Sequence, residues 1–167
     1  MRQKIFVVDA FTDRAFAGNP AAVCILPGPR DDGWRQDVAR EMNLSETAFL
    51  EKRDDGSYTL RWFTPAVEVD LCGHATLASA HILWETGDAE TGEPVRFHTR
   101  SGILSSLKKG DWIEMDFPAE PEEPAVAPPE LVEALGVEPL YTGRNRFDVL
   151  VEVGDEAVQL LGHVYAR

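Results

Sequence analysis

An α+β fold is expected for this chain of 167 residues, on three observations. Short β-rich runs and amphipathic runs alternate over residues 1–118. One predicted helix is apolar on most of its faces, as is typical of a helix buried at the centre of a fold. A proline-rich stretch then separates this part from a short remainder. Because 44% of the residues are hydrophobic, the chain can bury a core, and a folded protein is expected.

The first elements are two strands and a helix. Residues 4–10 and 21–26 are short runs of mainly apolar and β-branched side chains, which predicts a strand in each. The loop between them contains glycine and proline, as turns do. Asp31 or Asp32 can cap a helix that ends near residue 43, because apolar side chains recur there at helical spacing.

The middle of the chain predicts a hairpin, a second helix and further strands. The Asp-Asp-Gly sequence at residues 54–56 is typical of a hairpin turn. Residues 73–87 form an apolar helical pattern between a strand end and a glycine, which predicts the central buried helix. The other predicted strands cover residues 47–52, 58–63, 67–71, 94–101, 103–108 and 112–117.

The composition changes after residue 118. Residues 119–129 are rich in proline, glutamate and alanine without periodicity, which predicts a linker. The remainder, residues 130–167, contains a short helical pattern at 130–135, a strand at 147–153 and a helix start at 155–161. It is too short to build its own core, so it is expected to be the incomplete start of a second domain.

The charge balance limits the classes of partner. The formal net charge of −13 argues against binding of nucleic acid or of an anionic membrane surface. The longest apolar run, residues 21–26, is far too short to span a membrane, and no secretory signal pattern opens the chain. We therefore expect a cytoplasmic protein whose two cysteines are thiols.

The segment Leu-Cys-Gly-His-Ala-Thr at residues 71–76 lies at a predicted strand-to-helix junction. Gly73 lets the backbone approach a ligand, and the first amides of the helix favour an anion such as a substrate carboxylate. His74 could transfer protons near neutral pH. A Cys72 thiol beside a helix N-terminus has a lowered pKa and could act as a nucleophile or an acid/base. The alternatives are an incidental histidine and a cysteine that only fills the core.

Two further residues are candidates. Glu46 lies between the first helix and an apolar strand, where a carboxylate in an apolar cleft could act as a general base. Asn19 could bind a ligand from the rigid loop around it. The alternatives are a solvated glutamate and an ordinary turn. No phosphate-binding loop, dinucleotide motif or paired zinc-binding cysteines appear in the sequence, so these patterns indicate no metal or cofactor.

Taken together, these segments resemble a known family. Residues 8–12 (Val-Asp-Ala-Phe-Thr), 16–23 (Phe-Ala-Gly-Asn-Pro-Ala-Ala-Val), 42–49 and 63–78 are similar in order and spacing to the PhzF-like phenazine-biosynthesis family. The resemblance is strong over residues 4–118 and looser beyond the linker. It implies the diaminopimelate epimerase-like fold, in which each of two pseudo-symmetric lobes rolls a mixed sheet around a central helix.

The resemblance also implies roles for the candidate residues. Glu46 would be the general acid/base that moves the proton, without metal or organic cofactor. His74 and the amides of Gly73 and its neighbours would bind the substrate, and Asn19 would line the pocket. Cys72 falls where the epimerase relatives carry one of two catalytic cysteines, although no partner cysteine is visible. The named member of the family isomerises trans-2,3-dihydro-3-hydroxyanthranilate.

Members of the family are nearly twice as long as this chain. Their second lobe carries an Asp-Pro-Val-Thr-Gly-Ser-Ala-type segment, whose Asp and Ser face the position of Glu46. No such segment occurs here, so the second lobe is expected to be truncated and the strands from residue 141 onward to be unpaired, with exposed edges.

The sequence therefore predicts a PhzF-like isomerase or epimerase that moves a proton on a small carboxylate substrate. The alternative is a non-catalytic binding or assembly module derived from such an enzyme. A third hypothesis is a half-enzyme rebuilt by self-association, and exposed strand edges would favour a homodimer.

Overall fold

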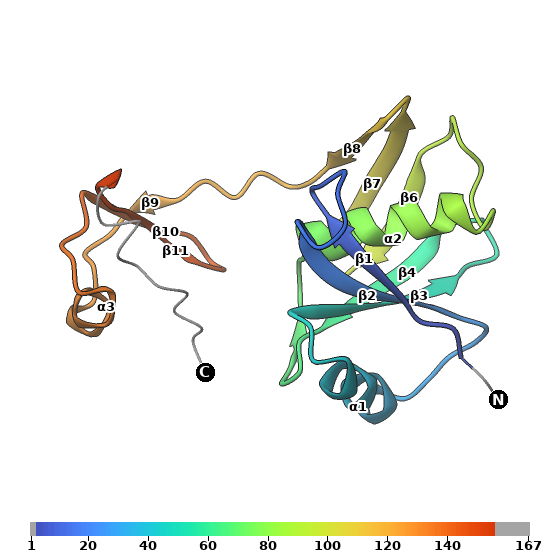
Figure 1. Ribbon diagram of the computed structural model, residues 1–167, viewed down its shortest axis with the longest axis horizontal. Helices are drawn as coiled ribbons and strands as arrows, with labels where there is room; N and C mark the ends of the chain where they lie inside the picture. Colours follow the sequence, from blue (N-terminus) through green and yellow to red (C-terminus); the bar gives the residue numbers. More distant parts are fainter. Residues whose placement is uncertain (1–2, 156–167) are drawn as a thin grey trace. The chain divides into compact units, whose positions relative to one another are not determined.

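The computed structural model describes residues 3–155 and divides the chain into two compact units, Met1–Phe117 and Pro118–Arg167 (Figure 1). The first unit contains a mixed sheet of eight strands. Its strands are β1 (Phe6–Ala10), β2 (Asn19–Leu26), β3 (Glu46–Lys52), β4 (Tyr58–Phe63), β5 (Glu68–Val69), β6 (Val95–Thr99), β7 (Gly102–Lys109) and β8 (Trp112–Asp116). The order is β1-β2-β3-β4-β6-β7-β8, with β5 paired to β4. The β2–β3 and β4–β6 pairs are parallel and the others antiparallel.

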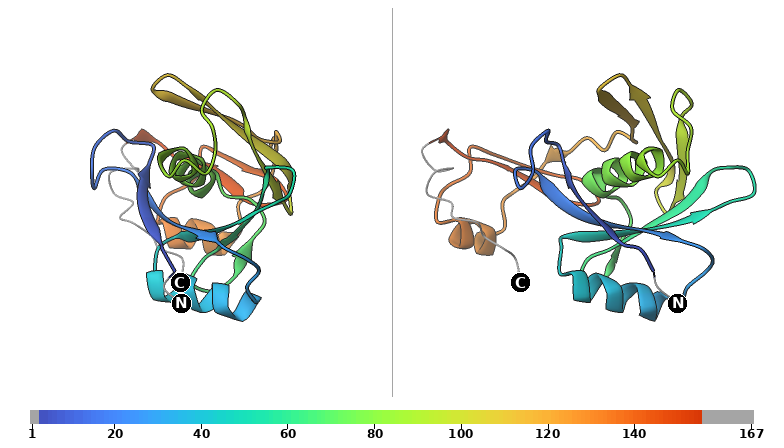
Figure 2. Two further views of the ribbon diagram at one scale, coloured as in Figure 1. Left: turned by 90° about the vertical axis from the view of Figure 1, so that its right-hand side faces the viewer. Right: turned by 45° about the vertical axis from the view of Figure 1, so that its right-hand side comes forward.

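Helix α2 (Gly73–Glu85) lies at the centre of this unit. It contacts β2 and β3 in the middle of the sheet and also β1 and β8 at its two edges. A sheet whose two edges both reach one helix must curl around that helix, as the end-on view in Figure 2 shows. The predicted mixed sheet rolled around a central helix is therefore confirmed.

Helix α1 (Asp32–Met42) covers the outer face of the sheet against β3 and β4. Side chains alternate along these strands, so that Phe49 and Phe63 pack under α1 while Leu50 and Trp62 face α2. Cys24 is fully buried in the same cluster as Phe49 and Phe63, so it is a core residue. Burial on both faces explains the continuous apolar runs in the middle of β2 and β3.

The strand predicted over residues 67–71 is shorter in the structure, where β5 covers Glu68–Val69. The Thr64 hydroxyl accepts hydrogen bonds from the amides of Ala66 and Val67, which turns the chain just before β5. Arg61 then binds both oxygens of Glu68 at 2.6 Å. This two-pronged ion pair fixes the segment that leads into α2.

The second unit contains β9 (Glu123–Pro124), α3 (Pro129–Leu135), β10 (Tyr141–Arg144) and β11 (Val149–Glu152). Its three strands form an antiparallel sheet in the order β11-β10-β9. The expectation that strands from residue 141 onward are unpaired is wrong, because β10 pairs on both sides. The carbonyl oxygen of the Asn145 side chain accepts from the amides of Phe147 and Asp148, and so closes the turn that pairs β10 with β11.

Two other expectations concern this part of the chain. The stretch predicted as a linker, residues 119–129, includes strand β9. The helix start predicted at 155–161 lies outside the described residues from 156 onward. None of the helices in the described part of the chain is long and apolar enough to cross a membrane.

Candidate functional site

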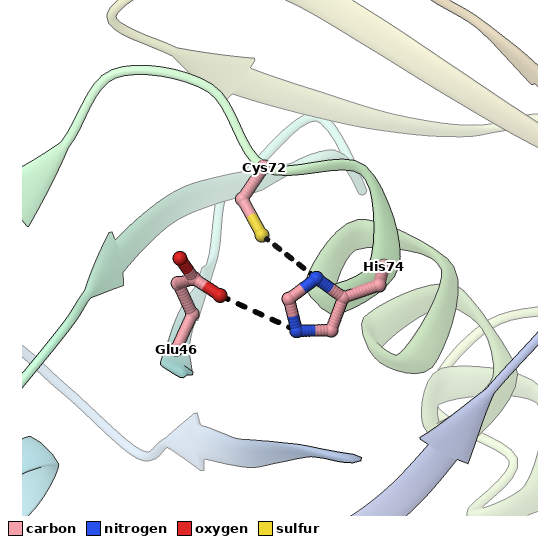
Figure 3. A group of neighbouring side chains, drawn as sticks. All are labelled: Glu46, Cys72 and His74. Carbon is pink, nitrogen blue, oxygen red and sulfur yellow. Dashed lines mark hydrogen bonds and ion pairs between the residues drawn. The ribbon is translucent and has the colours of Figure 1, made fainter. Parts of the chain in front are cut away.

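Glu46, Cys72 and His74 lie together where β3 and α2 begin, and we call them the acid–thiol–imidazole trio (Figure 3). Asn43 ends α1 in a left-handed conformation, with φ of 51°, and the chain then enters β3 at Glu46. Cys72 is the N-cap residue of α2, and His74 is in its first turn. Each of the three side chains has one atom that could bind a metal ion, and these three atoms lie within 4.8 Å of one another.

Both ring nitrogens of His74 face trio members. Its Nε2 lies 3.4 Å from Oε2 of Glu46 and 3.3 Å from the Ser45 hydroxyl. Its Nδ1 lies 3.5 Å from the Cys72 sulfur. The side chain of His74 is 9% exposed and that of Glu46 is 20% exposed. The trio is therefore a mostly buried cluster in which the carboxylate has the greater access to solvent.

Burial lowers the pKa of His74, and the nearby Glu46 carboxylate only partly opposes this effect. The imidazole is therefore neutral near pH 7 and carries a proton on one nitrogen only. Because a carboxylate accepts hydrogen bonds, the chemistry assigns this proton to Nε2, facing Glu46. Nδ1 then accepts from the thiol of Cys72.

Burial also raises the pKa of Cys72, with a further contribution from the Glu46 carboxylate, to about 12. The amides of Ala75 and His74 favour the thiolate but do not offset these effects. The prediction of a lowered pKa at this helix N-terminus is therefore wrong. Because Cys72 is only 8% exposed and lies beside a carboxylate, it is a neutral thiol near pH 7.

The first turn of α2 is open on the side of Gly73, where an added Cβ would meet nothing within 4 Å. Cys72 makes no side-chain capping hydrogen bond within the described part of the chain, although the amides of His74 and Ala75 lie beside its sulfur. Thr76 donates a hydrogen bond to the carbonyl of Cys72 at 2.6 Å and so ties the N-cap residue to the helix. This end of α2 thus offers backbone amides and free space to an anionic group.

Asn19 is the first residue of β2 and is exposed. Since β2 runs parallel to β3 and Ala21 is the register partner of Glu46, Asn19 lies at the same end of the sheet as the trio. Among the described residues, no hydrogen bond joins Asn19 to the trio. Gly18 before it is required by packing, because a Cβ there would lie 2.3 Å from the carbonyl oxygen of Ala10.

Sequence reasoning did not select Ser45, whose hydroxyl lies beside the His74 ring. The signal that could have indicated Ser45 is its position directly before Glu46 in the sequence. The other described histidines, His81 in α2 and His98 in β6, are half-buried and lie outside the trio.

Comparison with known proteins places these features in a family. The family model described as phenazine biosynthesis-like protein matches residues 8–136. An uncharacterized isomerase of Halalkalibacterium halodurans is 62% identical over 157 residues, which are 93% of this chain and 59% of that protein. An uncharacterized isomerase of Pseudomonas aeruginosa is 54% identical over 168 residues, covering all of this chain and 64% of that protein.

A solved structure of a PhzF-family protein from Enterococcus faecalis superposes with a TM-score of 0.80 at 40% identity, over 95% of this chain and 60% of that one. The chain thus spans about three-fifths of the length of each of these three relatives. Together with the sheet curled around α2, this match confirms the expected diaminopimelate epimerase-like fold. The chain belongs to the phenazine biosynthesis-like PhzC-PhzF family.

Proposed function

We propose that this chain supplies the proton-transfer residues of a cofactor-independent isomerase or epimerase that acts on a small carboxylate substrate. The observation that carries the proposal is the pairing of Glu46 with a neutral His74 at the open N-terminus of α2. The relatives at 62% and 54% identity are named isomerases, which supports the same reaction class.

In the proposed mechanism the substrate carboxylate binds the amides around Gly73. The carboxylate of Glu46 removes a proton from an activated carbon and then returns it at another position. The Nε2 proton of His74 holds the Glu46 carboxylate in place, and the Cys72 thiol fixes the tautomer of His74 by donating to Nδ1. Asn19, at the same end of the sheet, contacts the bound substrate.

Exchange of substrate hydrogen for deuterium in heavy water tests this proposal. The substrates are a panel of small amino and hydroxy carboxylates that includes trans-2,3-dihydro-3-hydroxyanthranilate, with mass spectrometry as the readout. Glu46→Gln should abolish exchange, and Glu41→Gln, an exposed residue on α1, should leave it unchanged. Exchange at the normal rate in Glu46→Gln would refute the role of this carboxylate.

A second candidate function is a non-catalytic binding or assembly module. Specific activity measured against protein concentration distinguishes the two. An enzyme rebuilt as a homodimer gains specific activity on concentration, whereas a binding module shows no exchange at any concentration.

A further inference from the structure

We propose that the acid–thiol–imidazole trio of Glu46, Cys72 and His74 is a binding site for a single Zn²⁺ ion, with a thiolate, an imidazole nitrogen and a carboxylate oxygen as ligands. Each ligand type is one that Zn²⁺ takes in proteins. The usual sequence patterns do not indicate such a site, because the trio contains one cysteine rather than a pair and draws its carboxylate from a distant strand.

The spacing of the ligands fits tetrahedral coordination. With Zn–S of about 2.3 Å and Zn–N of about 2.0–2.1 Å, a tetrahedral site holds its sulfur and nitrogen about 3.6 Å apart. The Cys72 sulfur and Nδ1 of His74 are 3.5 Å apart. One ligand atom of each of the three side chains lies within 4.8 Å of those of the other two. The Glu46 carboxylate faces Nε2 in the structure, so its side chain has to turn toward the Nδ1 side of the ring to complete a three-ligand site.

Two of the ligands are held by the backbone of one helix start. Cys72 and His74 flank Gly73 and are each 8% exposed, and Thr76 anchors the carbonyl of Cys72. Glu46 is the more exposed member and gives an ion a route from solvent. A fourth position stays open for water.

The charges balance on binding. Zn²⁺ displaces the thiol proton of Cys72, which leaves to solvent, and the resulting thiolate and the Glu46 carboxylate together neutralise the ion. The net charge of −13 on the chain also raises the local concentration of cations.

Binding of Zn²⁺ at the trio does not depend on the proposed reaction, but its effect on activity rests on the proposed function. Zn²⁺ at the trio would occupy Glu46 and His74, the groups proposed to move and position the proton. It would therefore act as a reversible inhibitor, relieved by chelation.

The test uses the full chain without an affinity tag and Co²⁺ as a spectroscopic substitute for Zn²⁺. We expect a thiolate-to-cobalt charge-transfer band in the near ultraviolet that saturates at one ion per chain and disappears on addition of Zn²⁺. Cys72→Ser should remove the band, and Glu46→Gln should weaken Zn²⁺ affinity, measured by calorimetry, by at least about 10–100-fold, the loss that even an outer partner of a ligand causes. Cys24→Ser and His81→Gln, outside the trio, should retain the band.

Absence of the band in the unaltered chain, or a band that survives Cys72→Ser, would overturn the site. Far-ultraviolet circular dichroism shows whether each variant is folded, and if Cys72→Ser is not, the affinity loss in Glu46→Gln decides the question. Deuterium exchange is measured separately with chelator present, so failure of metal binding is distinguishable from failure of the proposed function.

Discussion

The protonation state of Cys72 gives a direct test of the electrostatics at the trio. The structure raises the pKa of this thiol from 9.0 to about 12, whereas its position at a helix N-terminus alone would lower it. Only the thiolate reacts with iodoacetamide, so the alkylation rate reports the thiolate population. The rate is measured at the Cys72 peptide by mass spectrometry, in the native chain and in the same chain unfolded in urea.

The expected difference is large. At pH 8 a thiol of pKa 9.0 is about one-tenth thiolate, and one of pKa about 12 is about one ten-thousandth thiolate. Native Cys72 should therefore react about 1000-fold more slowly than unfolded Cys72. Between pH 8 and 10 its rate should keep rising about tenfold per pH unit, while the unfolded rate levels off near pH 9.

Glu46→Gln provides the matched perturbation. The Glu46 carboxylate opposes ionisation of Cys72, so its neutralisation should lower the thiol pKa and speed native alkylation. Burial stays as it was and remains the larger cause, so the variant should still react far more slowly than the unfolded chain. A native rate that reaches a plateau below pH 9, or one that falls in Glu46→Gln, would refute this account.

Two further predictions concern stability. The pKa of His74 in the folded chain lies below its ordinary value of 6.5. As pH falls below 6.5, the unfolded chain therefore takes up a proton at His74 before the native chain does. The neutral, buried imidazole contributes stability above pH 6.5, and this stability is lost as pH falls below that value. In urea unfolding, the free energy of unfolding of His74→Gln should fall less at acid pH than that of the unaltered chain. Identical pH profiles of the two chains would contradict the lowered pKa. Leu83→Ala removes a fully buried side chain of α2 and should cost about 2–5 kcal/mol in the same assay. Ile103→Ala, at a 62% exposed position on β7, should cost much less, and equal costs would mean that α2 is not the core helix.

Local signals predicted much of the first unit. Asp31 caps α1 by accepting from the amide of Trp34 at 2.8 Å, and the turn around residues 54–56 joins β3 to β4 as expected. The parallel pairs β2–β3 and β4–β6 had no such signal, because their partners are separated by a helix. The pairing of β10 was not predicted either, because its partners β9 and β11 carry no pattern that indicates it.

The sequence indicated which residues lie together at the site, but it did not indicate their protonation states correctly. Glu46 and His74 were selected from sequence, and the structure places them 3.4 Å apart. The pKa of Cys72 was predicted with the wrong sign, because neighbours along the chain revealed only the helix N-terminus. Burial and the Glu46 carboxylate, which decide the shift, depend on tertiary packing.

The geometry of the trio bears on which proton transfer we propose. Inversion at a single carbon by two bases requires an acid and a base on opposite faces of the substrate. The Cys72 sulfur lies within 4.8 Å of a Glu46 carboxylate oxygen, so both approach a substrate from the same side. As a neutral thiol that donates to His74, Cys72 is also poorly suited to act as the second base. On these grounds we propose a proton shift between two positions on one face, with Glu46 as both acceptor and donor, rather than inversion by paired thiols.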